Sequence, residues 1–181
     1  MYPDHSLMPK EAIRLAALGA LCGGTMRYGE LAAEVRDFTG HIMGPMIDVM
    51  GTSIELLRYE GLIEFADAGG EDNRDKAQLQ ITADGRQEVE TLMLSTVRTP
   101  FNDLNKLIVA LKMRFLHLLG SGDQRDQASI MTDACNAELA RLLELRGSHA
   151  EAGGHFLEWL DHDIDQARER LDWFNDLKDR L

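Results

Sequence analysis

Cysteine and proline are scarce in this sequence, and so are aromatic residues. The 181 residues include two cysteines and four prolines, and aromatic residues make up 6%. Two cysteines are too few for the disulfide framework that stabilises small secreted domains. Both, Cys22 and Cys135, lie in apolar helical patterns, where a free cysteine packs as a small hydrophobic residue. We therefore expect two buried, reduced thiols and a cytoplasmic protein.

Long apolar runs are also missing. A membrane-spanning helix needs roughly 20 consecutive apolar residues. The longest apolar stretch, residues 104–119, is interrupted by Lys106, Lys112, Arg114 and His117. Residues 1–10 lack the charged start and apolar block of a secretory signal. We therefore expect neither export nor membrane association.

Positive charge is in short supply. Lysine and arginine number 19 against 31 aspartates and glutamates, so the net charge is −12. DNA-binding proteins usually carry a basic surface, because contacts with phosphates supply much of their affinity. Net charge is not charge distribution, however, and a dimer can still present one basic face. The total counts against nucleic acid as a partner without excluding it.

Signatures of catalysis and of metal binding are weak. The sequence contains neither a glycine-rich phosphate loop nor a nucleophile-elbow serine, so we expect no enzyme and no cofactor. His155, Glu158 and His162 share a stripe of an expected helix, and these residue types bind zinc. The two histidines are seven residues apart, which is about 10 Å along a helix. They cannot ligate one ion together, and we predict no metal site.

Apolar residues at helical spacing dominate the first hundred residues. Helices are expected from Pro9 to Gly23-Gly24, from about Thr25 or Tyr28 to Thr39-Gly40, and from Gly44-Pro45 to Glu60-Gly61. Residues 62–65 and 77–81 read as two strands joined by a long polar loop, and Thr82 is a good N-cap for a fourth helix. Three helices, a hairpin and a helix make up the winged-helix plan.

The second half is expected to be all helical, with helices over about 100–119, 123–146 and 155–181. The last of these helices carries apolar residues at alternating spacings of three and four: Leu157, Leu160, Ile164, Ala167, Leu171 and Phe174. This seam is typical of helices that pack along their length. The fold class is therefore mostly α with a small β-hairpin.

Three motifs point to a family. The run Tyr59-Glu60-Gly61-Leu62-Ile63-Glu64 resembles the passage from recognition helix to wing in the PadR-like bacterial transcription regulators. Ile81-Thr82-Ala83-Asp84-Gly85-Arg86 is similar to their signature after the wing. Phe156-Leu157-Glu158-Trp159-Leu160 is similar to the tryptophan motif of their C-terminal helix. The resemblance covers most of the chain.

The resemblance implies a homodimeric repressor. Residues 1–99 would be a winged helix-turn-helix domain gripping a palindromic operator, and residues 100–181 a helical dimerisation domain. A small-molecule effector would release the DNA. For the contact between protomers we predict Leu157, Trp159, Leu160, Ile164, Leu171 and Phe174.

Side chains suited to DNA are few. Thr52, Ser53 and Arg58 lie on the outer face of the third helix, from which polar groups reach base edges. Phosphate contacts are predicted for Arg27, Tyr28 and Arg36 around the second helix, and for Arg74 and Lys76 in the wing. Residues 46–60 contain one arginine and three acids, and acids also share the wing loop. An acidic winged-helix adaptor that binds another protein and no DNA is therefore the alternative.

Overall fold

The computed structural model describes residues 1–43, 50–66, 77–98, 103–151 and 155–181. They form two compact units, which we call the N-terminal unit (Met1–Thr96 with Lys106–Leu118) and the C-terminal unit (Val97–Asn105 with Leu119–Leu181). The fold is mostly helical with a small antiparallel sheet, which confirms the expected fold class. Among the described helices, none is both long enough and apolar enough to cross a membrane.

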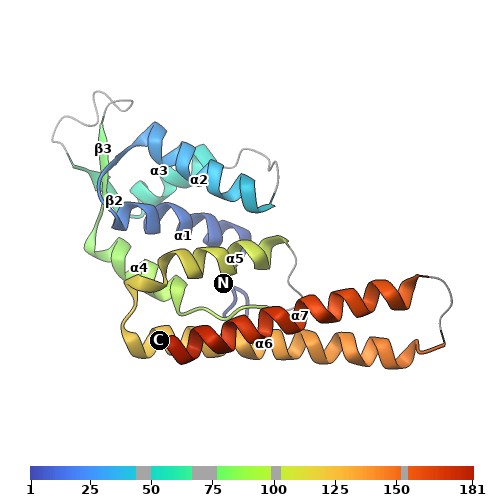
Figure 1. The fold of residues 1–181 in the computed structure, drawn as a ribbon. Helices are drawn as coiled ribbons and strands as arrows, with labels where there is room; N and C mark the ends of the chain where they lie inside the picture. Colours follow the sequence, from blue (N-terminus) through green and yellow to red (C-terminus); the bar gives the residue numbers. More distant parts are fainter. Residues whose placement is uncertain (44–49, 67–76, 99–102, 152–154) are drawn as a thin grey trace. The chain divides into compact units, whose positions relative to one another are not determined.

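The N-terminal unit follows the winged-helix order (Figure 1). Its elements are α1 (Pro9–Cys22), β1 (Met26–Arg27), α2 (Tyr28–Met43), α3 (Met50–Tyr59), β2 (Ile63–Phe65), β3 (Gln78–Ile81) and α4 (Ala83–Met93). The expected start of the third helix at Gly44-Pro45 and the loop of the hairpin lie outside the described residues. The hairpin itself is confirmed, because Ile63 pairs with Ile81 and Phe65 with Leu79.

A third strand joins the hairpin, which the sequence did not predict. β1 pairs antiparallel with β3, so that the strand order is β1-β3-β2. Met26 lies opposite Leu79 and Arg27 opposite Gln78. Two residues are too few to show the alternation by which strands are recognised, and the sequence pattern predicts the beginning of a helix here.

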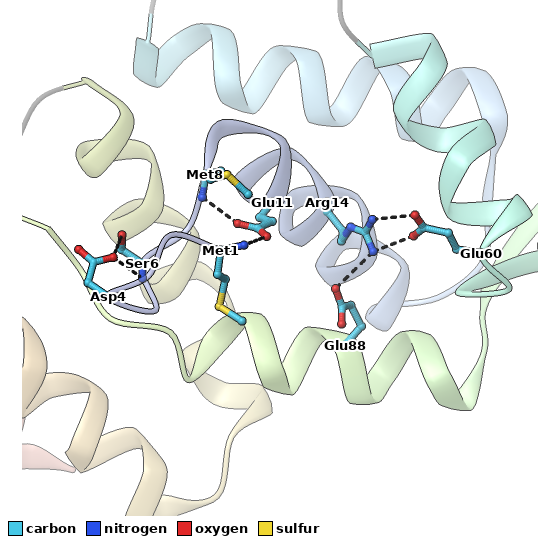
Figure 2. Close-up of polar contacts among 8 residues, drawn as sticks. All are labelled: Met1, Asp4, Ser6, Met8, Glu11, Arg14, Glu60 and Glu88. Carbon is cyan, nitrogen blue, oxygen red and sulfur yellow. Dashed lines mark hydrogen bonds and ion pairs between the residues drawn. The ribbon is translucent and has the colours of Figure 1, made fainter.

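Local polar contacts explain the start of α1 and the continuation of α2 through Thr39. Pro9 opens α1, and the Glu11 carboxylate accepts the backbone N–H of Met8 at 2.8 Å (Figure 2). α2 runs through Thr39, where it was expected to stop. The Thr39 hydroxyl donates to the carbonyl of Val35 at 2.8 Å, so the side chain is satisfied within the helix.

Two motif residues hold α4 against the wing. The backbone N–H of Gly85 donates to the Thr82 hydroxyl at 3.0 Å, which confirms Thr82 as the N-cap. A Cβ on Gly85 would lie 2.1 Å from the carbonyl oxygen of Leu62. Glycine is therefore required at position 85, because the start of α4 passes directly over the backbone that leads into β2.

Helix α5 (Asp103–Phe115) packs mainly with the N-terminal unit, although the predicted domain boundary placed it with the second half. The ammonium group of Lys112 is completely buried and donates to the carbonyls of Met93 and Ser95. The ring of Phe115 lies against Gly19, where a Cβ would come within 2.5 Å. These contacts join α5 to α1 and to the end of α4, and a short 3-10 turn, η1 (Leu116–Leu118), follows it.

The C-terminal unit is built around a pair of long helices, α6 (Ser121–Ser148) and α7 (Phe156–Arg180), which lie side by side (Figure 1). Arg146 near the end of α6 forms an ion pair of 2.6 Å with Asp161 near the start of α7, so the helices run antiparallel. The buried cluster in this pair consists of Leu142, Leu160, Ile164 and Ala167.

The two cysteines differ in burial. Cys135 in α6 is buried, and desolvation raises the pKa of its thiol to about 11. Cys22 at the end of α1 is half-buried, and burial raises its pKa as well. The expectation of two buried thiols therefore holds for Cys135, whereas Cys22 keeps part of its surface in water because it is the last residue of its helix.

Candidate nucleic-acid interface

The outer face of α3 exposes two large apolar side chains. Ile54 and Leu57 point into the core and are almost completely buried. Leu56 is 47% exposed and Tyr59 is 90% exposed, although both are large hydrophobic residues. The side chains of Thr52 and Ser53 lie outside the described part of the structure, so their predicted approach to base edges stays a prediction.

The two described acids in and directly after α3, Glu55 and Glu60, are each paired with an arginine. Glu60 follows α3 and forms a two-point contact with Arg14 of α1, whose guanidinium nitrogens lie 2.7 and 3.1 Å from its two carboxylate oxygens (Figure 2). Arg14 also reaches Glu88 of α4 at 3.3 Å. Glu55 contacts Arg58 at 3.3 Å. Both carboxylates that flank the exposed face are thus compensated by an arginine, a feature that residue counting in residues 46–60 could not show.

Arg58, predicted to approach base edges, is half-buried. Its guanidinium carbon lies 5.0 Å from the centre of the Phe65 ring in β2, a cation–π arrangement, while its Nη2 faces Glu55. Arg58 therefore connects α3 with β2. To reach a base it would have to exchange these contacts for contacts with DNA.

The cations predicted around the second helix lie in β1 and α2. Arg27 is exposed in β1, and its backbone N–H donates to the Glu30 carboxylate at 3.0 Å. This carboxylate occupies a donor near the N-terminus of α2, so the Arg27 side chain rather than the helix end is the better candidate for a phosphate contact. Tyr28 is half-buried and Arg36 is exposed. The predicted wing contacts Arg74 and Lys76 lie outside the described residues.

A groove of about 970 Å³ runs along α2. The described residues that line it are Met26, Glu30, Ala33, Glu34, Arg36, Asp37 and Gly40. Three of them are acids, and Glu34 is ion-paired with Arg114 of α5. Arg36 therefore lies in a locally acidic surface.

Part of the apolar seam of α7 that is predicted to join protomers is already buried within the chain. Leu160 and Ile164 pack against Leu142 of α6, and Phe174 is also buried. Leu157 and Leu171 are half-buried, whereas Trp159 is 55% exposed. Trp173 is 48% exposed. It is fourteen residues from Trp159, which places both on nearly the same helix face, and this spacing predicts that the two tryptophans anchor the contact between protomers together.

Aromatic and histidine side chains gather near the start of α7. The Phe156 ring stacks on Trp159 with centroids 6.2 Å apart and meets His149 edge-on at 5.7 Å. His155 lies 3.0 Å from Glu158, while His162 contacts Gln166 at 2.8 Å, so the two histidines engage different neighbours. In the described parts of the chain, no group of three metal-binding side chains comes together.

Comparison with known proteins gives the family. The model of the AphA-like transcriptional regulator family matches residues 2–178. Among the curated proteins, none matches the sequence. The solved structures to which the chain is similar include Bacillus subtilis PadR in complex with operator DNA, with 17% identity, 96% of this chain and 100% of that chain covered, and a TM-score of 0.42.

Two further structures show similar values. Bacillus subtilis PadR in complex with p-coumaric acid shares 16% identity over 96% of this chain and 97% of that chain, with a TM-score of 0.41. The protein smu.1604c from Streptococcus mutans UA159 shares 16% sequence identity over 94% of this chain and 98% of that chain, with a TM-score of 0.40. The motifs indicated a PadR-like transcription regulator. The family match confirms that the chain belongs to a family of transcriptional regulators. The chain belongs to the family of AphA-like transcriptional regulators.

Proposed function

We propose that this transcriptional regulator binds double-stranded DNA as a homodimer and represses transcription from a palindromic operator. The observation that carries the proposal is the winged-helix order of the N-terminal unit in a chain whose family regulates transcription. In this fold the second helix of the helix-turn-helix enters the major groove, and the wing lies beside it. A small molecule that binds the dimer and releases the DNA completes the proposal.

The charges around α3 are compatible with a phosphate backbone despite the net charge of −12. Glu55 and Glu60 are compensated by Arg58 and Arg14, so they repel phosphates less than free carboxylates would. Arg27 projects from β1 in the same unit. The proposed DNA contacts are Arg27, Tyr28, Arg36, Thr52, Ser53, Arg58, Arg74 and Lys76.

The proposed protomer contact lies on the C-terminal unit. A pair of helices has one mutual interface, and the remaining apolar residues stay in water unless another surface covers them. Trp159 and Trp173 are such residues, and tryptophan is typical of the centres of protein interfaces. A second copy that covers them would form a twofold dimer, and twofold symmetry of the protein requires a palindromic operator.

The test is fluorescence anisotropy of DNA from upstream of the protein's own coding region, titrated with protein across a salt series. We expect sequence-dependent binding that weakens steeply with salt, because phosphate contacts release counterions. Arg27→Gln should weaken binding on all sequences and lower the salt slope by about 1. The matched control is Arg125→Gln, which removes an exposed arginine from α6 and should leave both quantities unchanged.

One outcome of this titration would refute the proposed DNA binding. If the folded dimer binds neither this DNA nor a random duplex at low salt, DNA is not its partner. The acidic groove along α2 then favours the alternative function, an adaptor for a basic protein segment, because Glu30, Glu34 and Asp37 line one groove. A pull-down that uses the wild-type protein to capture a basic protein segment would test that function. The charge-reversed variant Glu30→Lys is the control and should capture less of this segment.

A further inference from the structure

We propose that Leu56 and Tyr59 read thymine methyl groups in the major groove, so that sequence recognition by α3 is largely apolar. This inference rests on the proposed DNA-binding function and deepens it. It concerns two residues that the sequence did not single out as DNA contacts. The argument uses their exposure, their shared helix face and the charges beside them.

The exposure of these side chains is unusual for their type. Leu56 is 47% exposed and Tyr59 is 90% exposed, while Ile54 and Leu57 of the same helix are almost completely buried. Residues three apart are neighbours on one helix face. Leu56 and Tyr59 therefore form one apolar strip that faces away from the core. Keeping such a strip in water costs free energy, which is recovered when a partner covers it.

The charges beside the strip indicate what kind of partner fits it. Glu55 is held by Arg58, and Glu60 by Arg14, so the flanking carboxylates are compensated inside the protein. Arg58 in turn lies over the Phe65 ring. The two described carboxylates next to the strip are thus each paired with an arginine. The surface that Leu56 and Tyr59 expose on α3 is apolar, apart from the phenolic hydroxyl of Tyr59.

In the major groove, the apolar feature that distinguishes one base from the others is the C5-methyl group of thymine. An aliphatic or aromatic side chain contacts this methyl group without needing a hydrogen bond. The same side chain gains nothing at the donor and acceptor edges of guanine and cytosine. An apolar strip on the recognition helix therefore selects operators with thymine at the positions that Leu56 and Tyr59 reach.

The experiment compares two versions of the same upstream DNA, one amplified with thymidine triphosphate and one with deoxyuridine triphosphate. Uracil pairs like thymine but lacks the methyl group. We expect the wild-type protein to bind the thymine version more tightly, by about fourfold for each methyl group that becomes buried. Leu56→Ala should lower affinity for the thymine version and reduce its preference over uracil.

Matched variants separate the strip from the rest of the surface. Leu94→Ala removes another exposed leucine, at the end of α4, and should keep the wild-type preference. Tyr59→Phe should keep the preference, because the ring remains, and Tyr59→Ala should reduce it. Circular dichroism and thermal unfolding of each variant confirm that it is folded.

Three results would overturn the inference. Equal binding of the two DNA versions by the wild-type protein, or a preference that survives in Leu56→Ala and Tyr59→Ala, would show that the strip does not read methyl groups although the protein binds DNA. No binding of either version by the folded protein would refute the proposed function itself, and this inference with it.

Discussion

The two units of this protein bury their apolar residues in different ways. In the N-terminal unit, helices and a sheet surround Leu15, Leu18 and Leu79, which are at most 1% exposed. In the C-terminal unit, two long helices bury Leu160 and Ile164 between them, and they leave Trp159 about half exposed. The N-terminal unit therefore encloses a core between several elements, whereas the long helices of the C-terminal unit bury a narrow seam and leave Trp159 and Trp173 outside it.

The largest effect is expected where the N-terminal unit has no spare room. Gly85→Ala places a methyl group on the Leu62 carbonyl oxygen, so backbone must move, and we expect a loss of about 3 kcal/mol in the free energy of unfolding. The counterpart in the other unit is Gly147→Ala in α6, where a Cβ would meet nothing within 4 Å. This change should stabilise by about 0.5 to 1 kcal/mol.

Urea unfolding followed by circular dichroism measures both changes. The two substitutions are chemically identical, so their difference reports the packing of the two units. Equal effects of the same sign would mean that α4 does not lie tightly against the start of the wing.

The next effect concerns the open face of the C-terminal unit. If a second copy covers it, Trp159→Ala and Trp173→Ala should each weaken dimerisation by about 2 kcal/mol, because tryptophans at the centre of an interface carry much of its energy. Sedimentation equilibrium gives the dissociation constant directly. Leu94→Ala in the N-terminal unit serves as the control. A wild-type protein that stays monomeric at all concentrations would contradict the comparison.

The remaining effect depends on pH, and it is expected from Lys112. Burial lowers the pKa of its ammonium group to about 7 in the folded protein, and the unfolded value is about 10.4. Between these values the unfolded chain binds the proton more strongly. The free energy of unfolding should therefore rise with pH in this window, by up to about 1.4 kcal/mol per pH unit. Below pH 7 both states are protonated, and the penalty for burying the charge is complete.

Urea unfolding at pH values from 6 to 10 tests this dependence. Lys112→Met should flatten the rise, whereas Lys106→Met, an exposed position on the same helix, should leave it as in the wild type. A parallel rise in Lys112→Met would show that other groups cause the pH dependence.

Much of the fold was predictable from local patterns. Pro9, Thr82 and the glycines at 23 and 24 mark helix ends, because their chemistry acts on neighbouring backbone groups. The hairpin and the helices of the second half follow from hydrophobic periodicity. Strand β1 was missed because it is two residues long, and α2 was ended too early because Thr39 can also bond within a helix.

The candidate site was less predictable than the fold. The sequence predicts that Arg58 contacts a base. In the structure its guanidinium group lies over the Phe65 ring of β2, a contact between two elements that the sequence of α3 alone does not show. From the sequence, the acids of the third helix are expected to repel DNA phosphates. In the structure Glu60 is compensated by Arg14, which is 46 residues away in the chain. Thr52, Ser53, Arg74 and Lys76 lie outside what the structure describes, so their roles stay proposals.

By itself, the sequence determined the order of the helices and the hairpin, the winged-helix plan and the family, because caps, turns and periodicity act over a few residues. The tertiary structure alone decided which of these elements share a core. It assigned α5 to the N-terminal unit through Lys112 and Phe115, and it left Leu56 and Tyr59 exposed on α3. Such contacts join residues that are distant in the chain, and a side chain's burial depends on every segment that folds against it.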